Sequence, residues 1–237
     1  APIVSPTNPY DLSSVDIMDS RLPPGSTNYS GQIFLLGTDG AGRDMLSSIF
    51  YGLRVSLGVG ALSGVIALTI GSFFGVSAAF FRGKYETIVM RIVDIQLSFP
   101  SILVALIIIA AFGKGIEKTM IALILVQWAY YARTARASAL VEMNKEYIDA
   151  ARCLAFGNTR IMFKHILPNC LAPLIVVGTL QTAHAISLEA TLSFLGLGLP
   201  VTEPSLGLLI GNGFEYMYSG DFWISIFPGV ALLITVG

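Results

Sequence analysis

Long uncharged stretches alternate with charged segments along this chain of 237 residues. The uncharged stretches include four that are rich in apolar residues, at residues 55–81, 95–113, 166–188 and 222–237. A helix needs about 20 apolar residues to cross the hydrocarbon core of a bilayer, so the first three stretches qualify by length. The pattern predicts an all-α fold, a polytopic transmembrane helix bundle.

A further span is predicted over residues 118–137. Its uncharged run is short, but Lys118 and Arg133 at the ends of the run can extend their charged groups toward the interface. Five spans are therefore expected, at about 55–81, 88–113, 118–137, 168–192 and from 222 onward.

Proline and glycine mark two of these spans. Pro100 lies inside the second span and is expected to kink it. The first span contains two GxxxG spacings, Gly60 with Gly64 and Gly71 with Gly75. This spacing favours close helix packing, although glycine is frequent in membrane helices without such a role.

Composition supports the membrane assignment. Charged residues make up 12% of the chain, hydrophobic residues 54%, and the mean hydropathy is +0.73. These values lie outside the usual range of soluble globular domains. Cys153 and Cys170 have no CxxC spacing and are interpreted as free thiols.

The basic residues predict the orientation in the bilayer, because Lys and Arg are enriched in cytoplasmic loops. Nine of the fourteen flank the first turnaround or the segment after residue 132: Arg82, Lys84, Arg91, Arg133, Arg136, Lys145, Arg152, Arg160 and Lys164. Residues 1–54 carry three Arg and five Asp, and residues 196–221 carry no basic residue. These two regions are expected to face outward.

Two regions are expected on this basis. Residues 1–54 form an extracytoplasmic segment with a short amphipathic helix, and residues 55–237 form the membrane domain. The chain starts with Ala1 and ends within an apolar run, so both ends are expected to be fragment ends. The N-terminal residues lack the apolar core of a signal peptide, and a membrane anchor upstream of Ala1 is expected.

The segment 141–168 is charged and amphipathic. Its first part has an apolar face made of Tyr147, Ile148, Ala151, Leu154 and Ala155. Gly157 is expected to end this helix, and a second short helix is expected to follow, up to Pro168. Such a pair could rest on lipid headgroups or dock into a groove of a soluble partner, and periodicity leaves both open.

The stretch "EYIDAARCLAFGNTRIMFKHILPN" resembles the EAA loop in the membrane subunits of binding-protein-dependent ABC importers. Asp149, Ala150 and Ala151 stand for Glu-Ala-Ala, and Ala155 stands where the family usually has Gly. "LGTDGAGRDMLSSIFYGLRVSL", "SFPSILVALIIIA" and "EATLSFLGLGLP" also resemble this family, specifically the second, C-type permease subunit of dipeptide, oligopeptide and nickel importers.

The resemblance implies a type I ABC importer permease fold in the bacterial inner membrane. It implies four partners besides the lipid bilayer, namely a homologous permease subunit, two ATP-binding subunits and an extracytoplasmic solute-binding protein; no nucleic acid partner is expected. Residues 141–168 become a coupling segment. The residues expected to couple to the ATP-binding subunit are Asp149, Ala150, Ala151, Leu154, Ala155 and Gly157.

Within that segment, Ala150, Ala151 and Leu154 are expected to enter the partner's groove, while Asp149 meets a basic residue there. The chain has no Walker A loop, because neither of its Gly-Lys pairs is followed by Ser or Thr. It is therefore expected to be no enzyme and to bind no cofactor or metal, with ATP and Mg in the partner subunits.

Ionisable residues at membrane depth are candidates for function. Glu189, His184 and Asp94 are expected to line the pathway or to lock helices together. Near the outer mouth, Asp39, Arg43 and Asp44 are expected to form a clasp, with Asp39 capping a short helix and pairing with Arg43.

The function expected is half of a translocation pathway, with peptides as the leading cargo and glutathione-like thiols, sugars or chelated nickel as alternatives. A self-sufficient secondary transporter or channel is the rival interpretation. Such a protein should show ion-coupling acids in several spans and an internal repeat, and neither is evident. An intramembrane enzyme is disfavoured because no catalytic constellation is evident.

Overall fold

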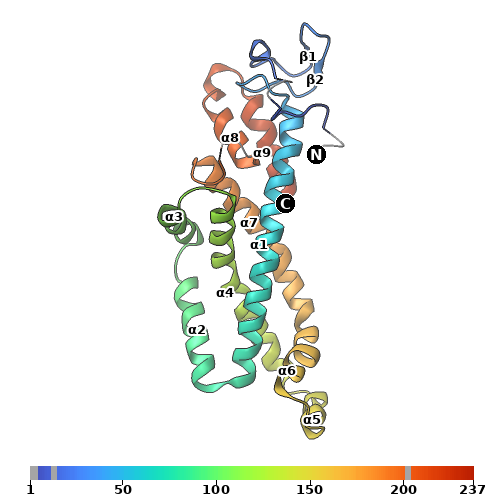
Figure 1. Ribbon diagram of the computed structural model, residues 1–237, viewed down its shortest axis with the longest axis vertical. Helices are drawn as coiled ribbons and strands as arrows, with labels where there is room; N and C mark the ends of the chain where they lie inside the picture. The colour runs from blue at the N-terminus through green and yellow to red at the C-terminus, as the bar shows by residue number, and fades with distance from the viewer. Residues whose placement is uncertain (1–4, 12–14, 201–203) are drawn as a thin grey trace. The chain divides into compact units, whose positions relative to one another are not determined.

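The computed structural model describes residues 5–11, 15–200 and 204–237 (Figure 1). In this part of the chain the regular structure is helical except for a hairpin of two-residue strands, β1 (Ser26–Thr27) and β2 (Ile33–Phe34). The α-helices are α1 (Met45–Phe81), α2 (Gly83–Leu97), α3 (Ser101–Phe112), α4 (Ile116–Glu142), α5 (Glu146–Cys153), α6 (Asn158–Arg160), α7 (Leu171–Phe194), α8 (Leu206–Phe214) and α9 (Trp223–Val236).

Four short helices complete the chain. The 3₁₀ helices are η1 (Ile17–Asp19), η3 (Leu167–Cys170) and η4 (Met217–Ser219), and η2 (Ile161–Ile166) is a π-helix. The helical content confirms the expected all-α fold class. Cys153 and Cys170 are free thiols, as expected.

The chain forms two compact units. Unit 1 contains residues 1–60, 108–119 and 186–237, and unit 2 contains residues 61–107 and 120–185. Acidic and basic residues are distributed unequally: unit 1 has ten acidic and five basic residues, whereas unit 2 has five acidic and nine basic ones. The nine basic residues that predict a cytoplasmic location therefore all belong to unit 2.

The core of unit 2 joins the membrane helices to the charged segment. Tyr131 of α4, Ile148 of α5 and Ile166 of η2 are each at most 1% exposed and belong to one cluster of apolar side chains. Ala67 and Val76 of α1 complete it on the other side. Burial of such side chains contributes about 25 cal/mol per Å² of apolar surface.

In unit 1 the core lies around α8 and α9. Met45, Leu206 and Trp223 are buried in one apolar cluster. The indole N–H of Trp223 donates to the backbone oxygen of Thr38 at 3.3 Å, which satisfies its polar atom inside the core. Gly213 of α8 faces the backbone of Ile224 so closely that a Cβ would lie 2.6 Å from it.

By length and composition, two helical stretches of the described residues can each cross a bilayer: Met45–Phe81 and Asn158–Phe194. The pair α2 and α3 qualifies only as one bent span, and α9 is a shorter apolar helix. Helix α4 is long enough but is not among the stretches that qualify. For α4 and α9, the expected crossing stays a prediction.

The second predicted span is broken rather than kinked. Helices α2 and α3 meet at 92° across residues 98–100. Pro100 has no N–H to donate, and its ring disfavours helical backbone at Phe99. The hydroxyl of Ser98 donates to the backbone oxygen of Asp94 at 2.7 Å and so closes the end of α2.

Residues 158–194 form one continuous helical stretch, so the expectation of a second separate short helix was wrong. Pro168 lies in η3, directly after the π-helix η2. The missing N–H of a proline breaks the regular ladder, and a π-turn followed by a 3₁₀ turn carries the chain past it. Residues 158–165, which include the basic Arg160 and Lys164, thus begin the same stretch that continues as α7.

Two glycines of α1 allow its backbone to approach α4. A Cβ on Gly71 would lie 2.5 Å from the backbone oxygen of Trp128, and one on Gly75 would clash in the same way with that of Ala132. A Cβ on Gly58, by contrast, would have no neighbouring atom within 4 Å, because this position faces open space. The packing interpretation of Gly71 and Gly75 is confirmed.

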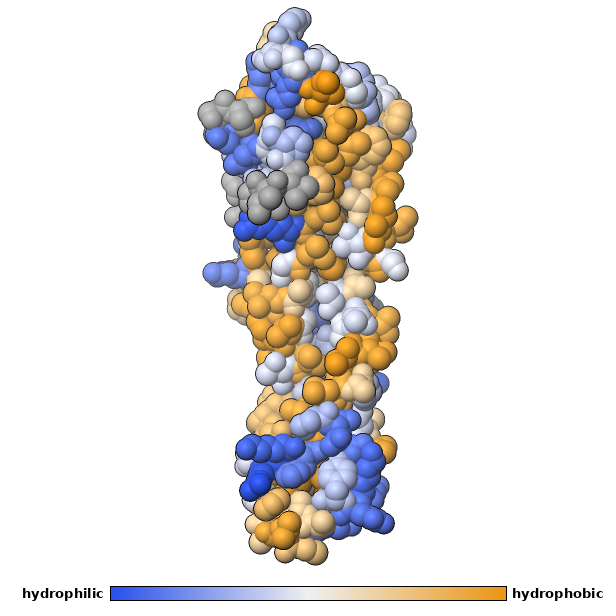
Figure 2. Space-filling model, turned by 90° about the vertical axis from the view of Figure 1, so that its right-hand side faces the viewer, coloured by the Kyte–Doolittle hydropathy of each residue, from blue (hydrophilic) through white to orange (hydrophobic). Residues whose placement is uncertain are grey.

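Hydrophobic side chains cover much of the face that Figure 2 shows, and hydrophilic ones gather near its lower end, where Figure 1 places α5 and α6. Exposed large side chains include Ile107 of α3, Leu180 of α7 and Leu233 of α9. Apolar surface of this extent marks contact with lipid or with another protein.

Gly71→Ala should lower the free energy of unfolding by about 1–3 kcal/mol, because its methyl group would push α1 from α4. Gly58→Ala is the matched control on the same helix and should be neutral or slightly stabilising. Thermal unfolding of both variants in detergent measures the difference. Equal melting temperatures would contradict the close packing.

Candidate functional site

Helix α5 is held by two side chains on its inner face. Ile148 is 0% exposed and Ala151 3% exposed, and both lie in the core of unit 2 with Ile161 and Met162 of η2. An isolated helix of eight residues is unstable in water, so this packing maintains α5. The small side chain of Ala151 allows the backbone of α5 to lie close to that core.

The end of α5 is a Schellman motif formed without glycine. The N–H of Phe156 donates to the Ala151 oxygen at 3.2 Å, and that of Ala155 to the Arg152 oxygen at 2.9 Å. Ala155 has a φ of +53°, in the left-handed region. Gly157 has a φ of −64° and precedes α6, so the expectation that Gly157 ends the helix was wrong.

The predicted coupling residues divide into a supporting and an exposed group. Ala151 is buried in the core, so the expectation that it enters a partner's groove was wrong, and it supports the surface from behind. Leu154 is 67% exposed just after α5. Asp149, Ala150, Ala155 and Gly157 are also exposed. The structure thus places an aliphatic side chain at the exposed tip of this segment, in a turn where apolar exposure has no structural role.

Asp149 already has a partner on its own helix. Its carboxylate lies 3.3 Å from the guanidinium of Arg152, and both side chains are largely exposed. Such surface pairs contribute at most about 1 kcal/mol. The Asp149 carboxylate can therefore exchange Arg152 for a basic residue of a partner at little cost.

A polar network fastens the start of α5 to the end of α4. The carboxylate of Glu142 accepts from the Lys145 ammonium and from the Tyr147 hydroxyl, each at 2.6 Å. The side-chain amide of Asn169 donates to the Tyr147 hydroxyl at 3.2 Å and to the His165 oxygen at 2.6 Å. Sequence reasoning missed this network, because no periodicity relates Asn169 to Tyr147.

The network shifts the ionisation of two of its members. Hydrogen bonds from Lys145 and Tyr147 hold the pKa of the Glu142 carboxyl below its usual range. Burial and the neighbouring Glu142 carboxylate raise the pKa of Tyr147 to about 12. The stability that Glu142 contributes is present above its unfolded pKa and is lost as pH falls through the lower folded pKa. The network is intact at neutral pH.

In unit 1, Glu189 lies at the centre of a second polar cluster. Its side chain is 0% exposed and accepts from the hydroxyls of Ser56, at 2.8 Å, and Ser193, at 2.7 Å. The Ser56 oxygen in turn accepts from the N–H of Leu206 at the start of α8, at 3.3 Å. Glu189 therefore connects α1, α7 and α8. Ser56 lies 133 residues away, so no local pattern reveals this partner.

His184 and Asp94 both make contacts between helices of unit 2. A ring nitrogen of His184 lies 3.2 Å from the Ser101 hydroxyl at the start of α3. The carboxylate of Asp94 in α2 pairs with Arg133 of α4 at 2.5 Å, and both side chains are more than half exposed. A role of either residue in a pathway stays a prediction.

The outer clasp differs from its expected form. Asp39 lies in a turn before α1, where its carboxylate accepts from the N–H groups of Ala41 and Arg43 at 2.9 and 3.0 Å. The predicted ion pair with Arg43 is confirmed at 2.7 Å. The predicted separate helix was wrong: α1 starts at Met45 and is continuous to Phe81. Asp44 caps it, because its carboxylate accepts from the Ser47 N–H at 2.9 Å.

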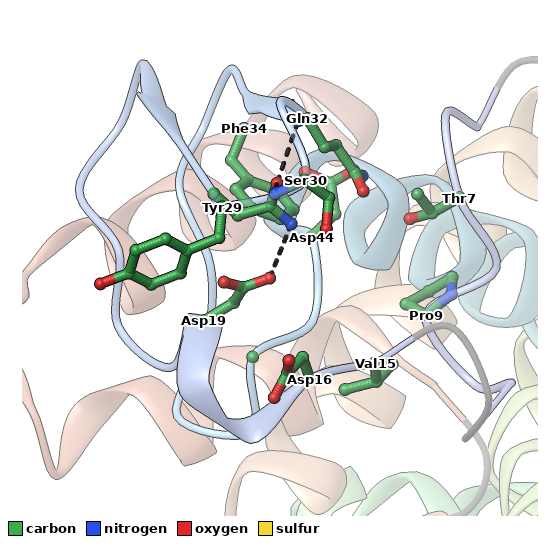
Figure 3. A pocket seen from close by; sticks show the side chains of 12 residues that line it. Thr7, Pro9, Val15, Asp16, Asp19, Tyr29, Ser30, Gln32, Phe34 and Asp44 are labelled. Carbon is green, nitrogen blue, oxygen red and sulfur yellow. Dashed lines mark hydrogen bonds between the residues drawn. The ribbon is translucent and has the colours of Figure 1, made fainter.

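Two surface cavities lie among the described residues of unit 1. The first, of about 350 Å³, is lined by Asp16, Asp19 and Asp44 among others (Figure 3). Each of these three carboxylates already accepts a hydrogen bond from a protein N–H group, as Asp19 does from the Asn28 amide at 2.8 Å. The second cavity has a volume of about 290 Å³. Its lining residues are Asp39, Gly40, Ala41, Arg43, Asn212, Glu215, Tyr216 and Ile224.

No group of three or more His, Cys, Asp or Glu side chains suited to a metal ion is gathered within residues 5–11, 15–200 and 204–237. The polar groups described above are engaged in hydrogen bonds or ion pairs, and those of Glu189, His184 and Asp94 connect different helices. The arrangement suits mechanical connection between helices and a docking surface at α5.

Comparison with known proteins agrees with this arrangement. The model of the family described as "Binding-protein-dependent transport system inner membrane component" matches residues 67–236. The matched region includes α5 and its exposed tip.

Individual relatives are similar over most of the chain. The dipeptide transport system permease protein DppC of Escherichia coli strain K12 is 41% identical over 98% of this chain and 76% of its own length. The di/tripeptide transport system permease protein DppC of Pseudomonas aeruginosa is 40% identical over 96% and 75%. A putative peptide transport system permease protein of Brucella suis is 42% identical over 90% and 69%.

Among solved structures, the MetNI methionine ABC transporter in inward-facing conformations is similar in fold. One crystal form matches with a TM-score of 0.67 and 23% sequence identity, over 81% of this chain and 91% of that chain. A second form matches with a TM-score of 0.65. This similarity confirms the expected fold, which is that of an ABC transporter membrane subunit.

Ala155→Gly should stabilise the end of α5 by about 1 kcal/mol, because glycine adopts a positive φ without the clash of a Cβ. Ala150→Gly is the matched control inside the same helix, and it should destabilise α5 by about 1 kcal/mol. Hydrogen exchange of the Ala155 and Phe156 amides measures both effects. Faster exchange in Ala155→Gly would refute the strained turn.

Glu189→Ala should destabilise unit 1 by about 2 kcal/mol, because it removes the acceptor shared by the Ser56 and Ser193 hydroxyls and leaves a void. Glu189→Gln keeps one carbonyl oxygen and the side-chain volume, so it should cost less. Thermal unfolding of the purified protein in detergent compares them. If Glu189→Ala melted at the wild-type temperature, the cluster would not hold the three helices.

Proposed function

The chain belongs to the family of binding-protein-dependent transport system inner membrane components, and from this premise we propose that it forms half of a peptide translocation pathway. It is a permease subunit of the inner membrane. Family membership argues against the rival interpretation of a self-sufficient secondary transporter or channel.

The cargo assignment is supported by the relatives. Those of Escherichia coli and Pseudomonas aeruginosa are named for dipeptide and di/tripeptide transport and are 41% and 40% identical to this chain over the aligned residues. We therefore assign short peptides as the cargo, in preference to thiols, sugars or nickel chelates. The partners are a second permease subunit and an extracytoplasmic solute-binding protein that delivers the peptide.

In this proposal, two ATP-binding subunits bind ATP and Mg and supply the energy for transport. The sequence of this chain has no Walker A loop, so hydrolysis requires another polypeptide. The charge distribution supports their location, since the nine basic residues of unit 2 favour a cytoplasmic position of α5. The outer segment before α1 faces the solute-binding protein.

The observation that carries the coupling role is the exposed tip of α5 on a buried base. Leu154 projects from the end of a helix whose inner face, Ile148 and Ala151, is packed into the core of unit 2. A subunit that binds the tip can move α5, and tight packing passes that displacement to η2 and α4. Coupling of this kind requires that the partner binds one conformation more tightly than the other.

Leu154→Asp should abolish peptide uptake and reduce copurification of the ATP-binding subunits, because burial of a leucine contributes about 2 kcal/mol or more to docking. The membrane level of the variant should stay normal, since Leu154 contributes little to the core. Uptake of a labelled dipeptide in proteoliposomes and pull-down of the assembled importer measure the two effects.

Val141→Asp is the control, because Val141 is a comparably exposed aliphatic residue that lies on α4, at the first position of the segment 141–168, and is not among the residues expected to couple. It should leave uptake near the wild-type rate. Normal uptake by Leu154→Asp would contradict the proposed coupling role of the α5 tip. Uptake of sugars but not peptides by the wild-type importer would instead refute the cargo assignment.

A further inference from the structure

Three polar side chains of unit 2 converge on a position where α1 has no side chain. A Cβ on Gly64 would lie 3.2 Å from the Thr182 hydroxyl, 3.8 Å from the Tyr131 hydroxyl and 3.9 Å from the Gln127 side-chain oxygen. Gln127 and Tyr131 lie one turn apart on α4, and Thr182 lies on α7. Three helices therefore enclose a small polar site.

The site contains an unsatisfied acceptor. Gln127 is 1% exposed, and its side-chain N–H donates to the Leu123 oxygen at 3.1 Å. Its carbonyl oxygen has no hydrogen-bond partner among the described residues. A buried amide oxygen without a partner costs about 1–3 kcal/mol, so this oxygen requires a donor that none of the described residues supplies.

The two hydroxyls define the chemistry of that donor. Thr182 donates its single proton to the Gly178 oxygen at 2.8 Å, so its oxygen faces the site as an acceptor. The Tyr131 hydroxyl can both donate and accept. The ligand must therefore donate two hydrogen bonds, to Gln127 and Thr182, and can accept one from Tyr131.

We propose that Gly64, Gln127, Tyr131 and Thr182 form a binding site for one internal water molecule that links α1, α4 and α7. Water supplies two donors and accepts hydrogen bonds, and buried waters typically make about three bonds to groups without other partners. A bare monovalent or divalent cation would require about six oxygen ligands, whereas three are gathered here. Gly64 adds no side chain to the site, and a Cβ there would lie in tight contact with the Thr182 hydroxyl oxygen.

This site gives Gly64 a role distinct from that of Gly71 and Gly75. Those two glycines face the backbone of α4 at a distance that excludes any Cβ. Around Gly64 the nearest atoms are polar side-chain oxygens at or beyond 3.2 Å. In the first GxxxG pair, Gly64 thus borders a polar solvent site and makes no direct backbone contact with α4.

Radiolytic hydroxyl-radical labelling of the importer assembled in lipid nanodiscs tests the proposal. Tyr131 is 1% exposed, so its ring should be oxidised only if water is bound beside it. We expect labelling of Tyr131 that resists a bulk radical scavenger. The fully exposed ring of Tyr29 serves as the internal reference, and its labelling should be quenched by the scavenger.

Gly64→Ala places a methyl group in the site and should reduce Tyr131 labelling severalfold, whereas Gly58→Ala on the exposed side of α1 should leave it unchanged. Thr182→Val keeps the shape but removes one acceptor, and it gives the same readout if Gly64→Ala fails to assemble. The proposal is overturned if wild-type Tyr131 stays unlabelled, if its labelling is quenched like that of Tyr29, or if neither variant reduces it.

Discussion

The packing of Ile148 and Ala151 into the core of unit 2 is the contact on which the proposed coupling surface depends. Helix α5 has eight residues and would not persist alone in water. Burial of these two side chains fixes its orientation, and the network around Glu142 fastens its start. Only with the inner face fixed does the exposed Leu154 become a point where a partner's movement is passed inward.

The same principle governs the polar groups inside the membrane helices. Each carries a large cost unless it finds a partner, so it connects helices as it is satisfied. Glu189 is satisfied by serines of α1 and α7, while Gln127 lacks a protein partner and calls for water. A permease must change conformation, and such hydrogen-bonded points determine which helices move together.

The unequal charge distribution between the two units connects fold to function. Basic residues predominate in unit 2, which also holds α5, and acidic residues predominate in unit 1. The excess of basic residues in unit 2 agrees with the cytoplasmic position proposed for α5. The family match and the relatives support the same division of roles, since this chain supplies the pathway and the proposed partners supply energy and cargo capture.

The sequence by itself determined the helical membrane fold and the family, and it predicted a coupling segment, because apolar stretches of fixed length and short motifs are local properties. Only the tertiary structure determined which of those residues are exposed and can contact a partner. It buried Ala151, exposed Leu154, assigned the positive φ to Ala155 rather than Gly157, and gave Glu189 a partner 133 residues away. Burial and long-range hydrogen bonds depend on how helices pack, and the periodicity of one helix does not show which helices pack against it.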